Sequence, residues 1–326
     1  MDKMEQYIRA ATRENTRKSY QSAITHYETE WGGFLPATAD DIAAYLVRYA
    51  PILAISTLRQ RLAALATWHN EQGFPDPTKA PHVKKIIKGI AELHPHKIKQ
   101  AKPLQLDHIE AMIQWIEHQL HHRTATSNRL KLLRDRALIL IGFWRAFRSD
   151  ELTRLRCEYT EVQPSKGIRF YLPRTKTDRT LSGQYYSVPA LQRLCPVKAF
   201  CDWIETCGLQ RGPVFPAINQ WGQLADTELN PVSIIAIIKD YAQKAGIPDA
   251  KEFSSHSLRR GFANWATTNH WHTKALMDYV GWKDVKSAMR YIGEQDPYQS
   301  NQFESIGSNM DGPGAQSGSL PLKQDE

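Results

Sequence analysis

The sequence predicts a mainly α-helical protein in two parts, a helical N-terminal domain and an α+β domain with a small antiparallel β-ribbon. Three observations predict this class. Apolar residues recur with helical spacing through residues 1–93, where no alternating strand pattern occurs. A stretch with three lysines, two prolines flanking its core and no acid spans residues 94–103, as expected of an interdomain linker. Beyond it, two short strand-like runs interrupt the helical pattern.

The N-terminal domain is expected to be helical throughout. In residues 16–31, Tyr20, Ile24, Tyr27 and Trp31 follow one another at intervals of four, three and four residues and form one apolar face. Proline and glycine mark the ends of other amphipathic stretches in this domain. Further helices are predicted for residues 39–50, 55–73 and 82–93.

The second domain, residues 104–295, is expected to begin with helices at 107–120 and 129–147. Strand-like runs at 167–173 and 183–189 flank a polar, turn-rich stretch and predict a β-hairpin or a three-stranded ribbon. Helices are expected to resume after the ribbon and continue to about residue 295. Residues 296–306 form a separate segment, and residues 307–326 are rich in Gly, Ser and Pro and are predicted to be disordered.

Composition indicates a globular protein with an anionic partner. Hydrophobic residues make up 41% and charged residues 23%, and the formal net charge is +8. Nucleic acid is the commonest partner of basic proteins. No apolar run is long enough for a membrane span and the N-terminus lacks a signal-peptide core, so no membrane partner and a cytoplasmic, nucleoid-associated location are expected. The four cysteines are interpreted as reduced packing residues.

A strip of basic residues crosses the predicted domain boundary. It contains one acid, Glu92, and it would suit a duplex backbone, where lysines that neutralise phosphates release counterions. A solvated helix face followed by a soluble linker would have the same composition, and both interpretations stay open. The strip consists of Lys84, Lys85, Lys88, Lys97, Lys99 and Lys102.

Reactive side chains occur at four places in the second domain. Arg148 and Glu151 begin a helix, and Lys176 lies at the tip of the predicted hairpin. In "HSLRR", His256 and Arg259 are expected to project from one face of a helix capped by Ser254 or Ser255. Trp282 and Tyr291 follow in "GWKDVKSAMRYIG". Two arginines can clamp the oxygens of one phosphodiester, a lysine can protonate a leaving oxygen, and a tyrosine with cationic neighbours can attack phosphorus.

The order Arg, Lys, His-x-x-Arg, Trp, Tyr resembles the tyrosine recombinase family, also called the phage integrase family. Intervals of 28 residues from Arg148 to Lys176, 23 from Arg259 to Trp282 and 9 from Trp282 to Tyr291 carry the resemblance. Trp282 stands where many relatives have a second histidine, and in this respect the sequence resembles the Cre-type branch of the family. Arg260 and Gly261 stand where relatives often have a His-Thr-type pair, a departure expected to alter packing and not chemistry.

The resemblance implies a role for each residue. Tyr291 would be the nucleophile that forms a 3′-phosphotyrosyl bond and releases a 5′ hydroxyl. Arg148 and Arg259 would clamp the scissile phosphate, and Lys176 would be the general acid. His256 and Trp282 would order the phosphate and the nucleophile, with Glu151 as a supporting residue. No metal, cofactor or ATP is expected.

The resemblance also implies an assembly. The chain would close as a C-shaped clamp around DNA, with residues 1–93 as the core-binding domain and residues 104–295 as the catalytic domain. A homotetramer would act on two double-stranded DNA sites with inverted-repeat cores, through a Holliday junction, to resolve or integrate DNA of a mobile element, plasmid or phage. Residues 296–306 would dock on a neighbouring subunit.

Three alternatives remain open at this point. The chain is interpreted either as a recombinase, as a non-catalytic DNA-binding protein on the same scaffold, or as a relaxing enzyme similar to type IB topoisomerases, which share the chemistry. A zinc enzyme is a further alternative, because His118 and His122 have i, i+4 spacing with His121 beside them. The sequence contains no HExxH order and suggests no third ligand for such a site.

Overall fold

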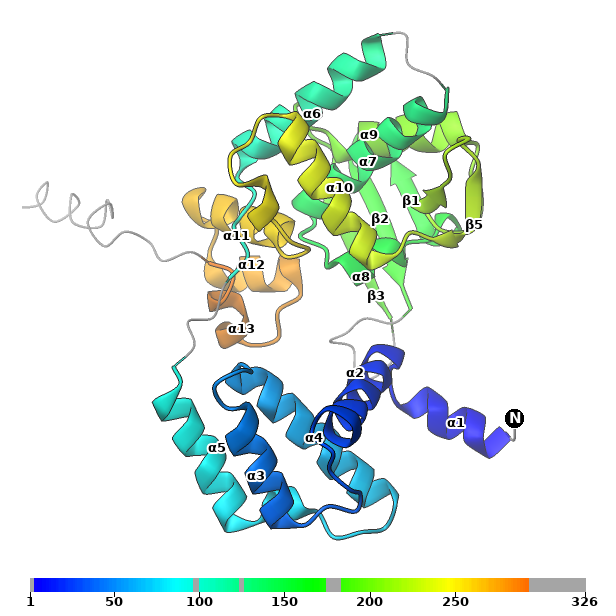
Figure 1. Cartoon of the computed structure of the whole chain (residues 1–326). Coiled ribbons are helices and arrows are strands. Elements are labelled where there is room, and N and C mark those ends of the chain that lie inside the picture. Colours follow the sequence, from blue (N-terminus) through cyan, green and yellow to red (C-terminus); the bar gives the residue numbers. More distant parts are fainter. Residues whose placement is uncertain (1–2, 96–99, 123–125, 174–182, 293–326) are drawn as a thin grey trace, which may run out of the picture. The chain divides into compact units, whose positions relative to one another are not determined.

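The computed structural model describes residues 3–95, 100–122, 126–173 and 183–292 (Figure 1). The chain divides into two compact units, Met1–Lys99 and Gln100–Glu326. This division falls within the stretch 94–103 that the sequence predicts to be a linker. The predicted docking segment 296–306 and the tail 307–326 lie outside the described residues.

The first unit is helical, and its described part contains no strand. Its core gathers apolar side chains from several helices, including Ile42, Leu46, Leu58 and Leu65, all fully buried. The helices predicted at 39–50, 55–73 and 82–93 are confirmed, whereas the first helix was not predicted. The α-helices are α1 (Lys3–Ala11), α2 (Glu14–Thr25), α3 (Ala39–Tyr49), α4 (Ile55–Glu71) and α5 (Pro81–Leu93), with a 3-10 turn at Pro77–Lys79.

The single helix predicted at 16–31 is wrong beyond Thr25. The chain widens there into a π-helical turn, His26–Glu30. This turn places the fully buried Tyr27 with its ring centroid 5.1 Å from that of Tyr45, and Trp31 at 6.1 Å from the same ring. The regular spacing of apolar residues in the sequence does not reveal this change of helical pitch.

The second unit combines helices with two small antiparallel sheets (Figure 1). The predicted ribbon is three-stranded in the order β1-β2-β3, with Phe170 of β2 opposite Thr160 of β1 and Tyr186 of β3. The helices are α6 (Leu106–His121), α7 (Thr126–Trp144), α8 (Ser149–Thr153), α9 (Pro196–Cys207), α10 (Pro231–Lys244), α11 (Ser257–Thr268), α12 (Thr273–Val280) and α13 (Val285–Met289). The strands are β1 (Thr160–Gln163), β2 (Gly167–Leu172), β3 (Gln184–Pro189), β4 (Pro216–Ile218) and β5 (Leu224–Glu228).

The second sheet corrects the expectation that only helices follow the ribbon. Strands β4 and β5 form a short hairpin between α9 and α10. Its turn is held by Asn219, whose Oδ1 accepts hydrogen bonds from the backbone N–H of Trp221 at 3.0 Å and of Gln223 at 2.9 Å. Gly222 takes the positive φ of 83° that this turn needs. Strands this short give too few alternations for a pattern to show.

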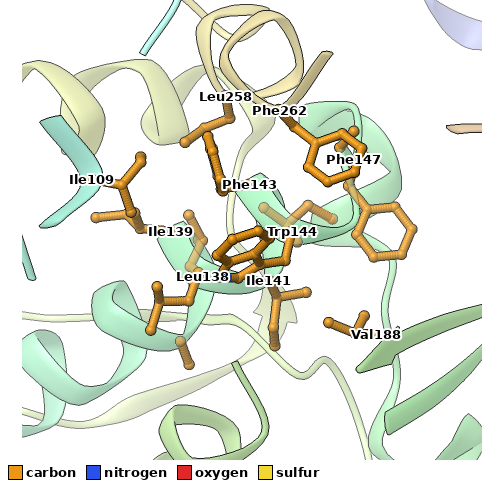
Figure 2. Close-up of a cluster of buried hydrophobic side chains, with 14 of the residues drawn as sticks. Ile109, Leu138, Ile139, Ile141, Phe143, Trp144, Phe147, Val188, Leu258 and Phe262 are labelled. Atoms are coloured by element: carbon orange, nitrogen blue, oxygen red, sulfur yellow. The ribbon is translucent and has the colours of Figure 1, made fainter. Parts of the chain in front are cut away.

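Side chains of helix α7 form a large part of the apolar core of the second unit (Figure 2). Residues 132–144 are buried on all sides of the helix, as expected of a helix surrounded by other elements. Leu138, Ile139 and Phe143 of α7 belong to one cluster with Ile109 of α6 and Leu258 of α11 (Figure 2). Within the described ranges, no helix is both long and apolar enough to cross a membrane. The packed α7 therefore gives the site at its C-terminal end a fixed base.

Candidate active site

The turn after α7 presents Arg148 to the site. The backbone N–H of Phe147 donates to the carbonyl of Gly142 at 3.2 Å, and Ala146 takes φ 52°. This arrangement ends a helix and usually has glycine at the left-handed position, because a Cβ there costs about 1 kcal/mol. The chain reverses at Ala146, and Arg148 becomes the N-cap residue that directly precedes α8.

Glu151 holds Arg148 at two points. One carboxylate oxygen accepts from the Arg148 backbone N–H at 2.9 Å, and the other pairs with its Nη1 at 2.6 Å. The Glu151 side chain is 3% exposed, while that of Arg148 is 20% exposed. The Arg148 guanidinium is therefore held in place by the buried Glu151 carboxylate, while the exposed part of the Arg148 side chain remains open to a ligand.

Arg259 of α11 is the second arginine beside Glu151, and it is almost fully buried, at 1% exposure. Its Nη1 donates to the carbonyl of Ala146 at 2.6 Å and its Nη2 to the carbonyl of Val280 at 3.2 Å. Nη1 also lies 3.9 Å from Glu151, which thus faces both arginines. Burial, and then the charge of Arg148, lower the pKa of Arg259 to about 10. The guanidinium is charged at neutral pH, but at a cost that a bound anion would offset.

His256 directly precedes α11 and is itself the N-cap residue, which corrects the predicted cap at Ser254 or Ser255. The helix starts at Ser257, and His256 is its N-cap residue. The Ser254 hydroxyl accepts from the His256 backbone N–H at 3.2 Å, so it supports the preceding turn and does not cap the helix. His256 and Arg259 still lie on one side, with the ring of Tyr291 5.8 Å from the imidazole and 5.5 Å from the guanidinium carbon.

Trp282 and Tyr291 complete the cluster from the end of the second unit. Gly281, at φ 75°, ends α12 and turns the chain so that Trp282 is buried. The Trp282 and Tyr291 rings stack, with centroids 5.3 Å apart and planes at 28°. The Tyr291 hydroxyl lies 3.1 Å from Nδ1 of His256. The buried Nε1 of Trp282 has no hydrogen-bond partner in the described part of the chain. The Tyr291 hydroxyl, the His256 imidazole and the free indole N–H of Trp282 therefore belong to one cluster of side chains.

The remaining predicted residues are placed only in part. Lys176 lies outside the described residues, between β2 and β3. Of the basic strip, Lys84, Lys85 and Lys88 are exposed on α5, and Lys97 and Lys99 lie outside the described residues. Lys102, in the other unit, has its Nζ 2.7 Å from Asp249, so a carboxylate already offsets its charge.

Gly261 and Arg260 hold the first segment of the second unit against α11. A Cβ on Gly261 would lie 1.7 Å from the carbonyl oxygen of Leu104, so the segment approaches as closely as glycine permits. The Leu104 backbone N–H donates to the Ser257 carbonyl at 3.0 Å. Arg260 donates from Nη1 to the side chain of Gln100. Arg260 and Gly261, which depart from the expected motif, therefore contact Gln100 and Leu104 and pack this segment against α11, the helix that carries Arg259.

The zinc alternative receives no support from geometry. His118 and His122 on α6 have their Nε2 atoms 2.9 Å apart, and His121 bonds through Nδ1 to the Glu117 carbonyl. Among the described residues, no group of three or more His, Cys, Asp or Glu side chains is arranged to hold a metal ion.

Two residues beside the site were not predicted from the sequence. Arg145 is buried at 5% exposure, and its guanidinium carbon lies 4.4 Å from the ring centroid of Tyr279. A signal for Arg145 was present, because it follows the apolar run "ALILIGFW" and comes three residues before Arg148. A cation next to such a run is expected to be buried only where something specific holds it.

Fold and site together define a tyrosine-type enzyme that breaks and rejoins DNA strands. The model of the phage integrase family matches residues 104–297. The chain therefore belongs to the phage integrase family, whose members are tyrosine recombinases.

The chain is similar in sequence to one curated relative and similar in fold to several solved structures. The chain is 26% identical over 303 residues to an integrase/recombinase xerD homolog of Selenomonas ruminantium, covering 90% of this chain and 85% of the relative. It is similar in fold to XerH recombinase bound to a palindromic difH substrate, with a TM-score of 0.58, 17% identity and coverage of 90% and 78% of the two chains. The Tn1549 transposon integrase in complex with circular intermediate DNA gives a TM-score of 0.58, 14% identity and coverage of 94% and 96%.

Proposed function

We propose that this chain is a site-specific recombinase whose Tyr291 attacks the scissile phosphate of its own DNA site. One observation carries the proposal. The Tyr291 hydroxyl lies 3.1 Å from His256 Nδ1 while its ring stacks on Trp282 and lies 5.5 Å from the Arg259 guanidinium carbon. We therefore assign the nucleophile and the cations that would receive the phosphate to the same subunit.

The chemistry follows from the atoms present. The Tyr291 oxygen attacks phosphorus and its proton passes to Nδ1 of His256, which is within hydrogen-bond reach. Negative charge grows on the non-bridging oxygens, and Arg148 and Arg259 stabilise it because their guanidinium groups are held in place beforehand. We assign the free Nε1–H of Trp282 as a further donor to the phosphate, as in the Cre-type branch that the sequence resembles.

Cleavage breaks the bond between phosphorus and the 5′ oxygen and leaves a 3′-phosphotyrosine. The departing oxygen takes a proton, which we assign to Lys176, and leaves as a 5′ hydroxyl. The 5′ hydroxyl of a second strand then attacks the phosphotyrosine, gives its proton to Lys176 and restores the phosphodiester, while His256 returns its proton to the released Tyr291 oxygen. One phosphoester bond replaces another in each step, so the cycle consumes no ATP.

We propose the following partners and assembly. Four copies bind two double-stranded sites with inverted-repeat cores and exchange one strand pair at a time through a Holliday junction. The helical first unit clamps the core sequence together with the second, and the exposed Lys84, Lys85 and Lys88 bind backbone phosphates. Such an enzyme works on nucleoid DNA in the cytoplasm, where it resolves or integrates a mobile element, plasmid or phage genome.

Covalent trapping tests the nucleophile. Wild type, Tyr291→Phe and Tyr298→Phe are each mixed with fragmented DNA of the source organism and denatured in SDS without ATP or metal, and protein-linked DNA is captured and sequenced. Tyr298 is the matched control, a second tyrosine seven residues further on. We expect adducts with wild type and Tyr298→Phe, none with Tyr291→Phe, and recurrent captured sequences that define the site.

Two results would contradict the proposal. Adducts that persist in Tyr291→Phe and disappear in Tyr298→Phe would transfer the nucleophile to the second tyrosine. Absence of adducts from wild type, despite tight binding to the same DNA, would point to a DNA-binding protein without strand cleavage.

A further inference from the structure

Arg145 is a buried cation held by aromatic rings and not by an acid. Its guanidinium carbon lies 4.4 Å from the ring centroid of Tyr279 on α12 and 4.7 Å from that of Tyr186 on β3. Within the described ranges, no carboxylate comes within ion-pair distance of it, and its buried Nε has no hydrogen-bond partner. Burial lowers the pKa of this guanidinium. A cation in such surroundings costs stability, which an apolar side chain of similar length would avoid.

Arg145 and Tyr279 form a reciprocal link between the ends of α7 and α12. Arg145 Nη1 donates to the backbone carbonyl of Tyr279. The Tyr279 hydroxyl donates in return to the backbone carbonyl of Trp144, the last residue of α7, at 2.8 Å. Each side chain therefore satisfies a carbonyl at the end of the other helix, where the helix itself leaves carbonyls unpaired.

The next residue on each side takes part in the site. Ala146 and Val280 follow Arg145 and Tyr279, and both of their carbonyls accept hydrogen bonds from Arg259. Two residues beyond each of these carbonyls stand Arg148 on one side and Trp282 on the other. The Arg145–Tyr279 link therefore joins the same two chain segments that carry Arg148 and Trp282, one residue before the pair of carbonyls that Arg259 bridges.

We propose that Arg145 is a positioning residue for strand cleavage, which sets the distance between Arg148 and the Trp282–Tyr291 pair through its link to Tyr279. This inference rests on the function proposed above. Arg145 itself is placed away from the phosphate, because it is 5% exposed, its Nη1 donates to the Tyr279 carbonyl, and the rings of Tyr186 and Tyr279 cover its guanidinium. Small displacements of reacting groups cost on the order of 10²-fold in rate, so the loss of this link should slow cleavage far more than it weakens DNA binding.

The test compares two substrates that differ in the charge of the scissile phosphate. A duplex of the sequence captured with wild-type protein is made with either a normal phosphodiester or a neutral methylphosphonate at the cleavage position. Single-turnover adduct formation is measured at saturating protein, and DNA affinity is measured separately. Arg148→Ala serves as reference, because a neutral phosphate needs the arginine clamp much less and the loss should shrink on methylphosphonate.

For Arg145→Met we expect the same pattern as for Arg148→Ala. Cleavage of the phosphodiester should fall on the order of 10²-fold, cleavage of the methylphosphonate about tenfold or less, and DNA affinity should stay close to wild type. Arg145→Lys, which keeps a cation and one donor, should recover part of the phosphodiester rate. If Arg145→Met does not fold, Tyr279→Phe removes only the hydroxyl bond to Trp144 and should show a smaller loss that is again specific to the phosphodiester.

The outcomes separate this inference from the proposed function. Equal losses on both substrates for Arg145→Met and Tyr279→Phe, with Arg148→Ala still specific to the phosphodiester, would show that Arg145 serves folding alone. Wild-type rates in both variants would overturn the inference as well. Equal losses for Arg148→Ala would refute the arginine clamp itself, and the positioning role of Arg145 would fall with it.

Discussion

Substitution of Gly261 by alanine should loosen the contact between α11 and the segment that starts the second unit. The new Cβ would lie 1.7 Å from the carbonyl oxygen of Leu104 and 2.7 Å from its carbonyl carbon. Normal contact requires a shift of about 1.5 Å or more. The obstacle is backbone, so no change of side-chain rotamer relieves it.

The expected cost can be worked from what that shift breaks. The hydrogen bond from Leu104 to the Ser257 carbonyl, at 3.0 Å, contributes about 1 kcal/mol. Leu104 is fully buried, and full burial of a leucine contributes about 1.5–3 kcal/mol, of which a part is lost. The higher helix propensity of alanine offsets about 1 kcal/mol of this loss, so we expect the free energy of unfolding to fall by about 1–2 kcal/mol. Phosphotyrosine formation should fall too, because Arg259 lies two residues earlier on α11.

Urea denaturation, followed by tryptophan fluorescence, measures this change in the full-length protein. Gly89→Ala in α5 is the matched control, since a Cβ there has nothing within 4 Å and alanine should stabilise the helix by about 1 kcal/mol. A Gly261→Ala protein within about 0.5 kcal/mol of wild type would refute the reasoning. Recovery of stability by a second change, Leu104→Ala, would refute it as well, because the clash is with the main chain.

Two further predictions concern buried polar groups. Glu151→Gln keeps the shape of the side chain but removes the charge that faces Arg148 and Arg259. The free energy of unfolding should therefore fall by about 2–4 kcal/mol in the same urea assay. An unchanged value would contradict the proposed support role of Glu151. Burial raises the pKa of Tyr27 to about 12 from 10.0, so the folded state retains a proton that the unfolded state loses, and wild-type stability should fall as the pH rises between 10 and 12. Tyr27→Phe should flatten that fall, measured as the urea midpoint against pH, without lowering stability at neutral pH, because the Tyr27 hydroxyl has no partner among the described residues. An equally steep alkaline loss in the variant would contradict this assignment.

The sequence was sufficient for the features that depend on residue type and order. The helical first unit follows from the spacing of apolar residues, and the ribbon from alternation in β2 and β3. Candidate site residues such as Arg148, His256 and Tyr291 could be named because guanidinium, imidazole and phenol groups carry their chemistry wherever they occur. Their common order and intervals then identified the family.

Features that depend on backbone geometry could not be predicted in the same way. The carbonyls of Ala146 and Val280 hold Arg259, but any residue has a carbonyl, so residue type gives no sign of this role. The start of α11 at Ser257 depends on a local turn in which the Ser254 hydroxyl accepts from the His256 backbone N–H, and the two adjacent serines in the sequence do not predict which of them takes this part. The link between Arg145 and Tyr279 joins residues 134 positions apart, and only the folded chain brings them together.

The close contact between Gly261 of α11 and the backbone of Leu104 has a practical consequence for the choice of a fragment that contains the second unit alone. The match to the family begins at residue 104, which would be a natural choice for the first residue of a catalytic fragment. A chain begun there would place a charged amino terminus where the Leu104 amide now meets the Ser257 carbonyl, and would discard Gln100, the partner of Arg260. A fragment that starts upstream of Gln100 keeps both the Leu104–Ser257 and the Arg260–Gln100 hydrogen bonds. The first residue of such a fragment should therefore be chosen from these contacts and not from the residue at which the family match begins.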